Sequence, residues 1–265
     1  MTIRVIVAGA TGWTGSAVAK AVLAANDLML VGAVARSSAG RDLGEALGSA
    51  AVGVTVVATV EEALKAGADV LVDYTKPGAV KANALKAISA GVAVVIGTSG
   101  LSADDYAEID KVAREKSVGV FAAGNYSITA TLMTKFALMA AKYVADVEVI
   151  DYASASKPDT PSGTARELAE RLSEVRQPAT SKPLNELGGV RETRGGAIGA
   201  VQVHSLRMPG YVLSCEAQFG APGERLLLRH DAGSDAAPYV AGTLLAVRHV
   251  REQAGLRRGL DLLID

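Results

Sequence analysis

Residues 3–15 read IRVIVAGATGWTG, and the architecture of the first half of the chain follows from this stretch. The run Ile3–Ala8 is apolar and rich in β-branched residues, which predicts a buried strand. Gly9 permits a tight turn after that strand, Gly12 lets the backbone approach a pyrophosphate, and Gly15 allows close packing of strand and helix. The spacing therefore predicts a strand–turn–helix unit that binds a dinucleotide.

Strand and helix signals alternate along the rest of this half. Short apolar runs recur at Met29–Val34, Val54–Val57, Val70–Tyr74, Ala93–Ile96 and Val118–Ala122. Helix starts lie between them, for example where Thr59 precedes Glu62 at the spacing of a capping box. Fully apolar strands separated by helices are typical of a parallel sheet covered on both faces. We therefore expect an α/β fold with a Rossmann-like first domain.

The pattern changes near Tyr126. A long helix is expected over about residues 127–145, and a final helix over Ala237–Arg251. Between them the strand-like runs are longer and more alternating, which favours a mixed or antiparallel sheet. These runs are Val147–Ala153, Ile198–Leu206, Tyr211–Phe219 and Glu224–Asp231, with a polar, proline-containing loop expected over Gln177–Gly189.

Composition excludes several classes of partner. The 27 basic and 28 acidic residues give a net charge of −1, so neither nucleic acid nor an anionic membrane is expected to bind. No apolar run has the length of a membrane span. The one cysteine, Cys215, excludes an intrachain disulfide and fits a reducing cytoplasm. No spacing of His, Cys, Asp and Glu indicates a metal site.

The end of the second predicted strand bears on the choice of cofactor. An NAD site normally has Asp or Glu there to bind the ribose hydroxyls. Here the sequence is Val34-Ala35-Arg36-Ser37-Ser38, without a carboxylate. Arg36 and Ser37 suit a 2′-phosphate, because a guanidinium binds phosphate with two parallel hydrogen bonds. We therefore predict NADPH, with NADH as the alternative.

A second motif, KPDTPSGTA at Lys157–Ala165, precedes a helical pattern that runs to about Leu172. Backbone N–H groups at a helix start lack intrahelical acceptors and suit a carboxylate or phosphate. The turn Ser162–Thr164 is therefore a candidate anion site, and Lys157 adds a cation nearby. An ordinary capped helix after a proline turn is the alternative.

Several segments, in order along the chain, resemble the dihydrodipicolinate reductase family. The family's signature ends in Lys, one residue, Asp, one residue and PSGTA, as here. Matching motifs occur as Asp73-Tyr74-Thr75, Gly97-Thr98-Ser99-Gly100, Ala123-Gly124-Asn125-Tyr126-Ser127, and Gly223–Leu226 with His230. The likeness covers nearly the whole chain.

The resemblance implies a fold and a site. It implies a Rossmann-like dinucleotide-binding domain (residues 1–126 and 236–265) and a smaller mixed α/β domain for substrate binding and oligomerisation (residues 127–235). In that family the turn at Gly97 and the segment Ala123–Tyr126 border the nicotinamide, and the second domain's sheet forms a tetramer. The implied cofactor-binding residues are Gly9, Thr11, Gly12, Trp13, Thr14, Gly15, Arg36, Ser37, Thr75, Gly97, Thr98, Ser99, Ala123, Asn125 and Tyr126.

The chain also departs from the family pattern. Trp13 stands where the glycine loop usually has Arg, and Ala35 where Glu is frequent. The histidine pair of the signature is replaced by Ala153 and Ser154, and the third histidine by Ser156. Lys157 is therefore the only retained proton donor of the motif, and a lysine ammonium can act as a general acid. His204 or Arg207 is the candidate replacement for a lost histidine.

Three functions remain open from the sequence. The first is an NADPH-dependent reductase of a carboxylate-bearing cyclic imine, similar to 4-hydroxy-tetrahydrodipicolinate reductases of lysine biosynthesis. The second is an imine reductase, or an amine or amino-acid dehydrogenase, with another substrate, which the lost histidines would explain. The third is a dinucleotide-binding protein without catalysis. In the first two, Lys157 and His204 are the catalytic candidates and Lys157, Ser162, Gly163 and Thr164 bind the substrate; a homodimer or homotetramer is expected.

Overall fold

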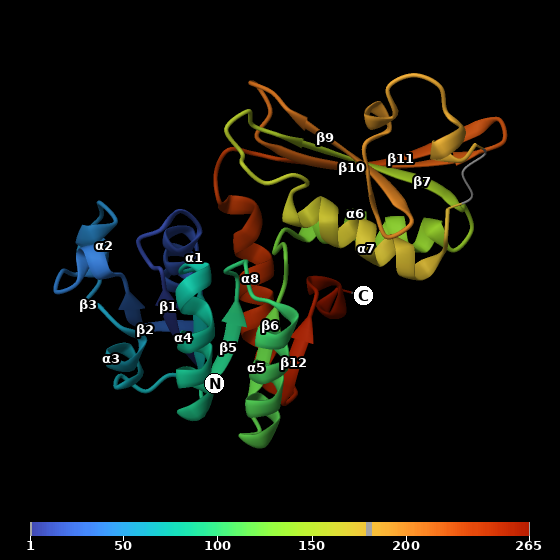
Figure 1. Ribbon diagram of the computed structural model, residues 1–265. Coiled ribbons are helices and arrows are strands. Elements are labelled where there is room, and N and C mark those ends of the chain that lie inside the picture. The colour runs from blue at the N-terminus through green and yellow to red at the C-terminus, as the bar shows by residue number, and fades with distance from the viewer. Residues whose placement is uncertain (1, 179–181, 265) are drawn as a thin grey trace. The chain divides into compact units, whose positions relative to one another are not determined.

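The computed structural model describes residues 2–178 and 182–264 (Figure 1). The chain forms two compact units. Unit 1 comprises Met1–Ile128 and Asp235–Asp265, and unit 2 comprises Thr129–Ser234. The divisions expected from the sequence lay at residues 126 and 236.

Unit 1 is built on a seven-stranded sheet in the order β12-β6-β5-β4-β1-β2-β3, and all neighbouring strands are parallel. The strands are β1 (Ile3–Ala8), β2 (Leu28–Val34), β3 (Val56–Val57), β4 (Val70–Asp73), β5 (Ala93–Ile96), β6 (Gly119–Ala122) and β12 (Gly255–Arg258). The strand order reverses between β1 and β4. In open α/β sheets ligands bind at the carboxyl ends of the strands beside such a reversal. The predicted Rossmann-like class is confirmed.

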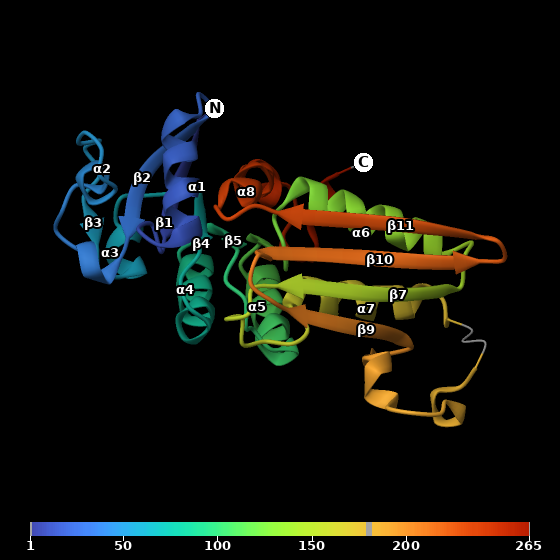
Figure 2. The same ribbon diagram turned by 90° about the horizontal axis from the view of Figure 1, so that it is seen from above.

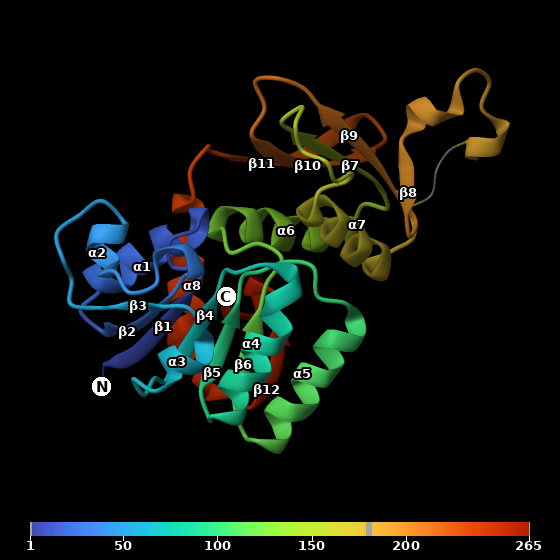
Figure 3. The same ribbon diagram turned by 60° about the vertical axis from the view of Figure 1, so that its left-hand side comes forward.

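Helices cover both faces of this sheet (Figures 1 and 3). Helices α1 and α8 pack together on one face, and α4 and α5 pack together on the other. The helices of unit 1 are α1 (Trp13–Ala24), α2 (Leu43–Ala46), α3 (Val60–Leu64), α4 (Pro77–Ser89), α5 (Ala103–Glu115) and α8 (Ala237–His249), with short 3₁₀ turns at Arg36–Ser38, Val250–Glu252 and Leu260–Leu263. Because both faces are covered, residues on both sides of β1 and β4 are inaccessible to water.

Glycine is required where the first turn meets its neighbours. Gly9 has φ +79°, and a Cβ there would lie 2.2 Å from the Tyr74 carbonyl oxygen. A Cβ on Gly15 would lie 2.1 Å from the Gly9 carbonyl oxygen. Both distances are far below van der Waals contact, so the glycine spacing allows α1 to begin directly against the turn after β1.

Unit 2 is a five-stranded mixed sheet in the order β11-β10-β7-β9-β8 (Figure 2). Its strands are β7 (Asp146–Ala153), β8 (Gly196–Ile198), β9 (Val201–Arg207), β10 (Leu213–Ala221) and β11 (Glu224–Ala232). Only the β7–β9 pair is parallel. Helices α6 (Ile128–Ala141) and α7 (Gly163–Val175) cover one face, and short 3₁₀ turns occupy Leu184–Glu186 and Arg191–Arg194.

Alternation along the strands of unit 2 separates two faces. Val149 and Val203 are buried with α6 and α7 in one apolar cluster. Successive side chains of a strand point to opposite faces, so Asp151 and Ser205 share the helix-covered face, whereas Glu148 and His204 lie on the other. Only polar groups on the helix-covered face can therefore contact the start of α7.

Two parts of the fold differ from the sequence expectation. Strand β12 was not predicted, because GLRR is short and half polar; it pairs with β6 at the sheet edge. The predicted strand Ile198–Leu206 is interrupted at Gly199, which has φ +57° and sends the chain back as a hairpin of β8 and β9. Within the described residues of the predicted loop Gln177–Gly189, a 3₁₀ turn forms; residues 179–181 lie outside the described part.

No helix within residues 2–178 and 182–264 combines the length and the apolar character that a membrane span requires.

The glycine packing yields a matched pair of substitutions. Gly15→Ala forces a methyl group against the Gly9 carbonyl, so we expect a loss of about 2–3 kcal/mol in the free energy of unfolding and at least a tenfold weaker affinity for a nicotinamide dinucleotide. Gly78→Ala, also inside a helix, meets no atom within 4 Å; its helix propensity should leave stability equal or raised by up to about 1 kcal/mol. Urea unfolding and cofactor titration measure both. Equal behaviour of the two variants would contradict the packing account.

Candidate active site

The turn after β1 presents an anion site at the carboxyl edge of the unit 1 sheet. The Gly9 and Ala10 N–H groups donate to the Val34 carbonyl at 2.9 and 3.1 Å, which ties the turn to the end of β2. Helix α1 starts at Trp13 without a side-chain cap and without an acidic residue in its first turn. Within the described part of the chain, the Trp13 and Thr14 N–H groups have no acceptor. This arrangement fits a pyrophosphate.

Arg36 stands two residues beyond the end of β2, in a short 3₁₀ turn, beside Ser37. Both side chains are exposed. No hydrogen bond or ion pair of the Arg36 guanidinium forms among residues 2–178 and 182–264, whereas nearby Arg41 donates to the Glu45 carbonyl. An unpaired guanidinium at this edge can bind a phosphate, and the adjacent Ala35 offers no carboxylate that would compete for it.

Asp73 organises the next two turns of this edge. Its carboxylate is fully buried at the end of β4 and accepts four donors. Thr75 donates its N–H at 2.9 Å and its hydroxyl at 2.6 Å, Asn83 donates at 2.8 Å, and the Thr98 hydroxyl donates at 2.8 Å. A buried carboxylate requires such donors. The turns that carry Thr75 and Thr98 are therefore held together by one side chain.

Tyr74 fixes the turn at Gly97. A Cβ on Gly97 would lie 2.2 Å from the Tyr74 ring, so the ring packs directly on the glycine. The Tyr74 hydroxyl pairs with the Thr243 hydroxyl of α8 at 2.6 Å. Burial raises the pKa of Tyr74 above its ordinary value. Tyr74 is thus a support of the site, and Ser99 is exposed at the end of the same turn.

The segment Ala123–Tyr126 lies where β6 ends. The Asn125 side chain accepts the Ser127 N–H at 2.8 Å and so closes a local turn. Tyr126 differs from its expected role, because its side chain is 2% exposed and its hydroxyl donates to the Ile96 carbonyl at 2.8 Å. Burial raises the pKa of Tyr126. Its ring belongs to the core, so Tyr126 can offer a cofactor only its backbone.

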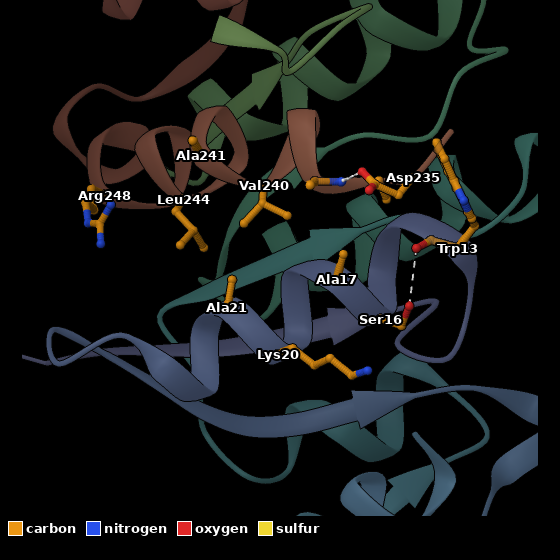
Figure 4. Close-up of a pocket in the computed structure, with 12 residues that line it drawn as sticks. Trp13, Ser16, Ala17, Lys20, Ala21, Asp235, Val240, Ala241, Leu244 and Arg248 are labelled. Atoms are coloured by element: carbon orange, nitrogen blue, oxygen red, sulfur yellow. Dashed lines mark hydrogen bonds between the residues drawn. The ribbon is translucent and has the colours of Figure 1, made fainter. Parts of the chain in front are cut away.

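A groove of about 960 Å³ runs between α1 and α8 within unit 1 (Figure 4). Trp13 stands at one end, 59% exposed, with its ring edge-on to Tyr239 at 5.8 Å between centroids. The walls are mostly small apolar residues. Arg248, at the other end, is paired with Asp27. The groove is large, but its lining places no proton donor or nucleophile next to a second reactive group, so we do not assign the catalytic site to it.

In unit 2, Asp151 holds the start of α7. This fully buried carboxylate accepts the Ser162 N–H at 2.8 Å and the Ser162 hydroxyl at 2.7 Å. Ser205 and Arg207 of β9 also donate to it, at 3.2 and 2.7 Å. The Ser162 hydroxyl then caps α7 by accepting the Ala165 N–H. The turn is therefore anchored by Asp151, a residue that no motif in the sequence marks.

This anchoring changes one part of the expected anion site. The Ser162 N–H was expected to bind a carboxylate, but it is occupied by Asp151. Gly163 is exposed, and a Cβ on it would meet nothing within 4 Å. In the described residues its N–H has no acceptor, so the open donor of the turn is the Gly163 N–H rather than the Ser162 N–H.

Lys157 lies in the loop before this turn, 31% exposed, with its ammonium 2.8 Å from the Asp159 carboxylate. Its N–H donates to the Ser154 carbonyl, and the Ser154 and Ser156 hydroxyls pair at 3.0 Å. The hydrogen bond from Lys157 holds the pKa of Asp159 below its usual range. The serines thus shape the loop, and Lys157 is its one ammonium group.

His204 is placed away from the turn. On the face of the sheet not covered by α6 and α7, its Nε2 lies 2.7 Å from the Glu148 carboxylate, which also pairs with Arg194. Strand alternation therefore separates His204 from Ser162, whereas Arg207 reaches the helix-covered face. Of the two expected replacements for a motif histidine, only Arg207 meets the anion site, and it does so as the partner of Asp151.

The comparisons with known proteins cover the full length. Residues 3–126 match the family model described as dihydrodipicolinate reductase, N-terminus, and residues 129–263 match dihydrodipicolinate reductase, C-terminus. A 4-hydroxy-tetrahydrodipicolinate reductase of Desulfitobacterium hafniense is 40% identical over 265 residues, or 99% of each chain.

Two solved structures are also similar. One is a dipicolinate-bound dihydrodipicolinate reductase from Paenisporosarcina sp. TG-14, with a TM-score of 0.86, 30% identity and full coverage of both chains. The other is an amine dehydrogenase from Mycobacterium smegmatis, with a TM-score of 0.69, 18% identity, and coverage of 98% and 96% of the two chains. The second likeness concerns the fold alone.

The role of Asp73 in holding the cofactor turns can be tested against the loss of an acid elsewhere on β4. Asp73→Ala leaves the donors of Thr75, Asn83 and Thr98 without an acceptor, so we expect a loss on the order of 3 kcal/mol in stability and a cofactor affinity at least tenfold weaker. Asp69→Ala is the control at the opposite end of β4, where Asp69 accepts the Arg4 N–H. It should leave cofactor affinity unchanged. Denaturant unfolding with cofactor titration decides; intact affinity in Asp73→Ala would refute the assignment.

Proposed function

The chain belongs to the dihydrodipicolinate reductase family, and we propose that it reduces a cyclic, carboxylate-bearing imine with NADPH, as a 4-hydroxy-tetrahydrodipicolinate reductase of lysine and diaminopimelate biosynthesis. Members of this family are NAD(P)H-dependent oxidoreductases acting on a C=N bond. The observation that carries the proposal for this chain is the open N–H group of Gly163 on a turn that Asp151 locks in place, with the Lys157 ammonium in the loop before it.

The dinucleotide, when bound, supplies the hydride for the imine carbon. The residues of unit 1 supply its binding site. The start of α1 fits the pyrophosphate, because the Trp13 and Thr14 N–H groups have no acceptor among the described residues and the first turn of α1 carries no acidic side chain. The turns at Thr75 and Thr98, held by Asp73, line the same edge of the sheet. The exposed Arg36 supports NADPH over NADH, since it suits a 2′-phosphate.

Unit 2 provides the groups that bind and protonate the substrate. A substrate carboxylate accepts the Gly163 N–H at the positive end of α7, and the Thr164 hydroxyl adds a donor to the same turn. The Lys157 ammonium gives its proton to the imine nitrogen, which becomes a secondary amine when hydride reaches the carbon. Asp159 holds the lysine side chain in place at 2.8 Å. Lys157 thereby takes the role of the histidines that this chain lacks.

The uncovered face of the unit 2 sheet supports a homo-oligomer, a dimer or tetramer. It carries a network in which Tyr152 donates to Glu216, and Arg229 lies 4.7 Å above the Tyr152 ring. Leu227 is 54% exposed on the strand at its edge. An extended face with aromatic, apolar and paired charged groups suits self-association. A biosynthetic reductase with one buried cysteine also suits the cytoplasm.

The replaced histidines favour one alternative, a reductase of another imine or an amine or amino-acid dehydrogenase. Those enzymes would also need the dinucleotide site, so only the substrate distinguishes them from a 4-hydroxy-tetrahydrodipicolinate reductase. We expect oxidation of NADPH with 4-hydroxy-tetrahydrodipicolinate and little with acyclic oxo acids plus ammonia. The reverse order of rates would favour the alternative, and binding of cofactor without oxidation of any imine would indicate a non-catalytic protein.

A substitution at Arg36 tests the choice of cofactor. Arg36→Ala should weaken NADPH binding about 10- to 100-fold, the range for one lost charge-assisted contact, and should leave NADH binding unchanged. Arg41→Ala is the matched control from the same loop, because Arg41 is engaged with the Glu45 carbonyl. Fluorescence titration of both reduced cofactors measures the effect. Tighter binding of NADH than of NADPH by the unaltered protein would overturn the preference.

Substitutions at Lys157 and His204 test proton donation. Lys157→Met should lower kcat about 10²- to 10⁴-fold, while NADPH affinity stays the same because Lys157 belongs to the other unit. His204→Ala should keep near-normal turnover, since His204 is bonded to Glu148 on the opposite sheet face. Steady-state kinetics with the authenticated imine compares the two. Full turnover by Lys157→Met would remove the lysine from the mechanism, and a collapse in His204→Ala alone would transfer the role to the histidine.

A further inference from the structure

The turn that is proposed to bind a substrate carboxylate is itself hydrogen-bonded to a carboxylate of the protein, Asp151. Asp151 lies directly behind it and is bonded to both the N–H and the hydroxyl of Ser162, the residue before Gly163. Asp151 is fully buried, so water cannot screen its charge. An uncompensated charge at this position would repel the anion that the helix start attracts. The anchoring of the turn and the binding of an anion are therefore in electrostatic conflict.

Arg207 resolves this conflict. Its Nη2 donates to Asp151 Oδ2 at 2.7 Å and to the Asp159 carbonyl at 2.7 Å. Its Nη1 donates to the Leu206 carbonyl at 2.8 Å. The side chain is only 14% exposed, so the pair interacts through protein more than through water. Its position at the end of β9 is fixed by the parallel register with β7, which pairs Ser205 with Asp151 and Arg207 with Ala153.

We propose that Arg207 is a positioning residue that neutralises Asp151, so that the Asp151-anchored turn can hold a negatively charged substrate. The inference rests on the proposed function for the identity of the anion. It adds a role for two residues that do not touch the substrate: Asp151 sets the direction of the turn, and Arg207 cancels the charge which that anchoring introduces.

The same guanidinium connects the turn to the proposed proton donor. Through the Asp159 carbonyl, Arg207 holds the backbone of the residue whose carboxylate pairs with Lys157. Arginine is suited to this task, because its planar fork can reach a carboxylate and several carbonyls at once. The anion-binding turn and the lysine loop are thus braced by one side chain from β9.

The test uses three variants of the full chain: Arg207→Met, Arg207→Lys and the double variant Asp151→Asn with Arg207→Met. Calorimetry measures binding of pyridine-2,6-dicarboxylate, a stable dicarboxylate probe. NADPH titration and thermal unfolding check that each variant is folded. Arg207→Met leaves Asp151 charged and alone, so we expect the dicarboxylate to bind on the order of 10- to 100-fold more weakly.

The double variant distinguishes charge compensation from a structural role. It removes both charges, so dicarboxylate affinity should return to within about fivefold of the unaltered protein, and Arg207→Lys should also stay within about fivefold. Should Arg207→Met fail to fold, these two variants carry the test. A double variant as weak as Arg207→Met, or more than about 30-fold weaker than the unaltered protein, would overturn the inference, as would normal binding by Arg207→Met. Failure of the unaltered protein to bind the dicarboxylate would overturn the proposed function and this inference with it.

Discussion

A carboxylate that is shut off from water must be surrounded by donors, and both of the proposed ligand-binding regions depend on that requirement. In unit 2, Asp151 gathers Ser162, Ser205 and Arg207 from two elements and thereby fixes where α7 begins. In unit 1, Asp73 gathers Thr75, Asn83 and Thr98 and fixes two turns at the carboxyl edge of the sheet. Each buried acid thereby ties loop residues to the end of a strand.

The positions at which the family motif has histidines are Ala153, Ser154 and Ser156 in this chain. The residues that anchor the proposed anion site are different ones. Asp151 precedes the altered positions on β7, and Arg207 reaches it from β9. Only the proton donor then needs a replacement. Lys157 lies in the same loop, with its ammonium held by Asp159.

Much of the fold could be predicted from local patterns, because glycine spacing, apolar runs and helix caps act over a few residues. Thr59, for example, accepts the Glu62 N–H at the predicted start of α3. The candidate site was harder to predict from the sequence. Asp151 reads as one polar residue in an alternating strand, and its importance comes from Ser162 and Arg207, which lie 11 and 56 positions away. Likewise, the face on which His204 lies depends on the register of β9 against β7, and β12 forms only because β6 offers it an edge.

The central claim is that the turn anchored by Asp151 receives the substrate's carboxylate. A crystal structure of the protein with NADPH and pyridine-2,6-dicarboxylate tests it most directly. We predict that one carboxylate accepts the Gly163 N–H, while the Ser162 N–H stays on Asp151 and Arg207 stays paired with the same acid. A dicarboxylate bound away from Gly163, or a Ser162 N–H that leaves Asp151 to bind the ligand, would contradict the account.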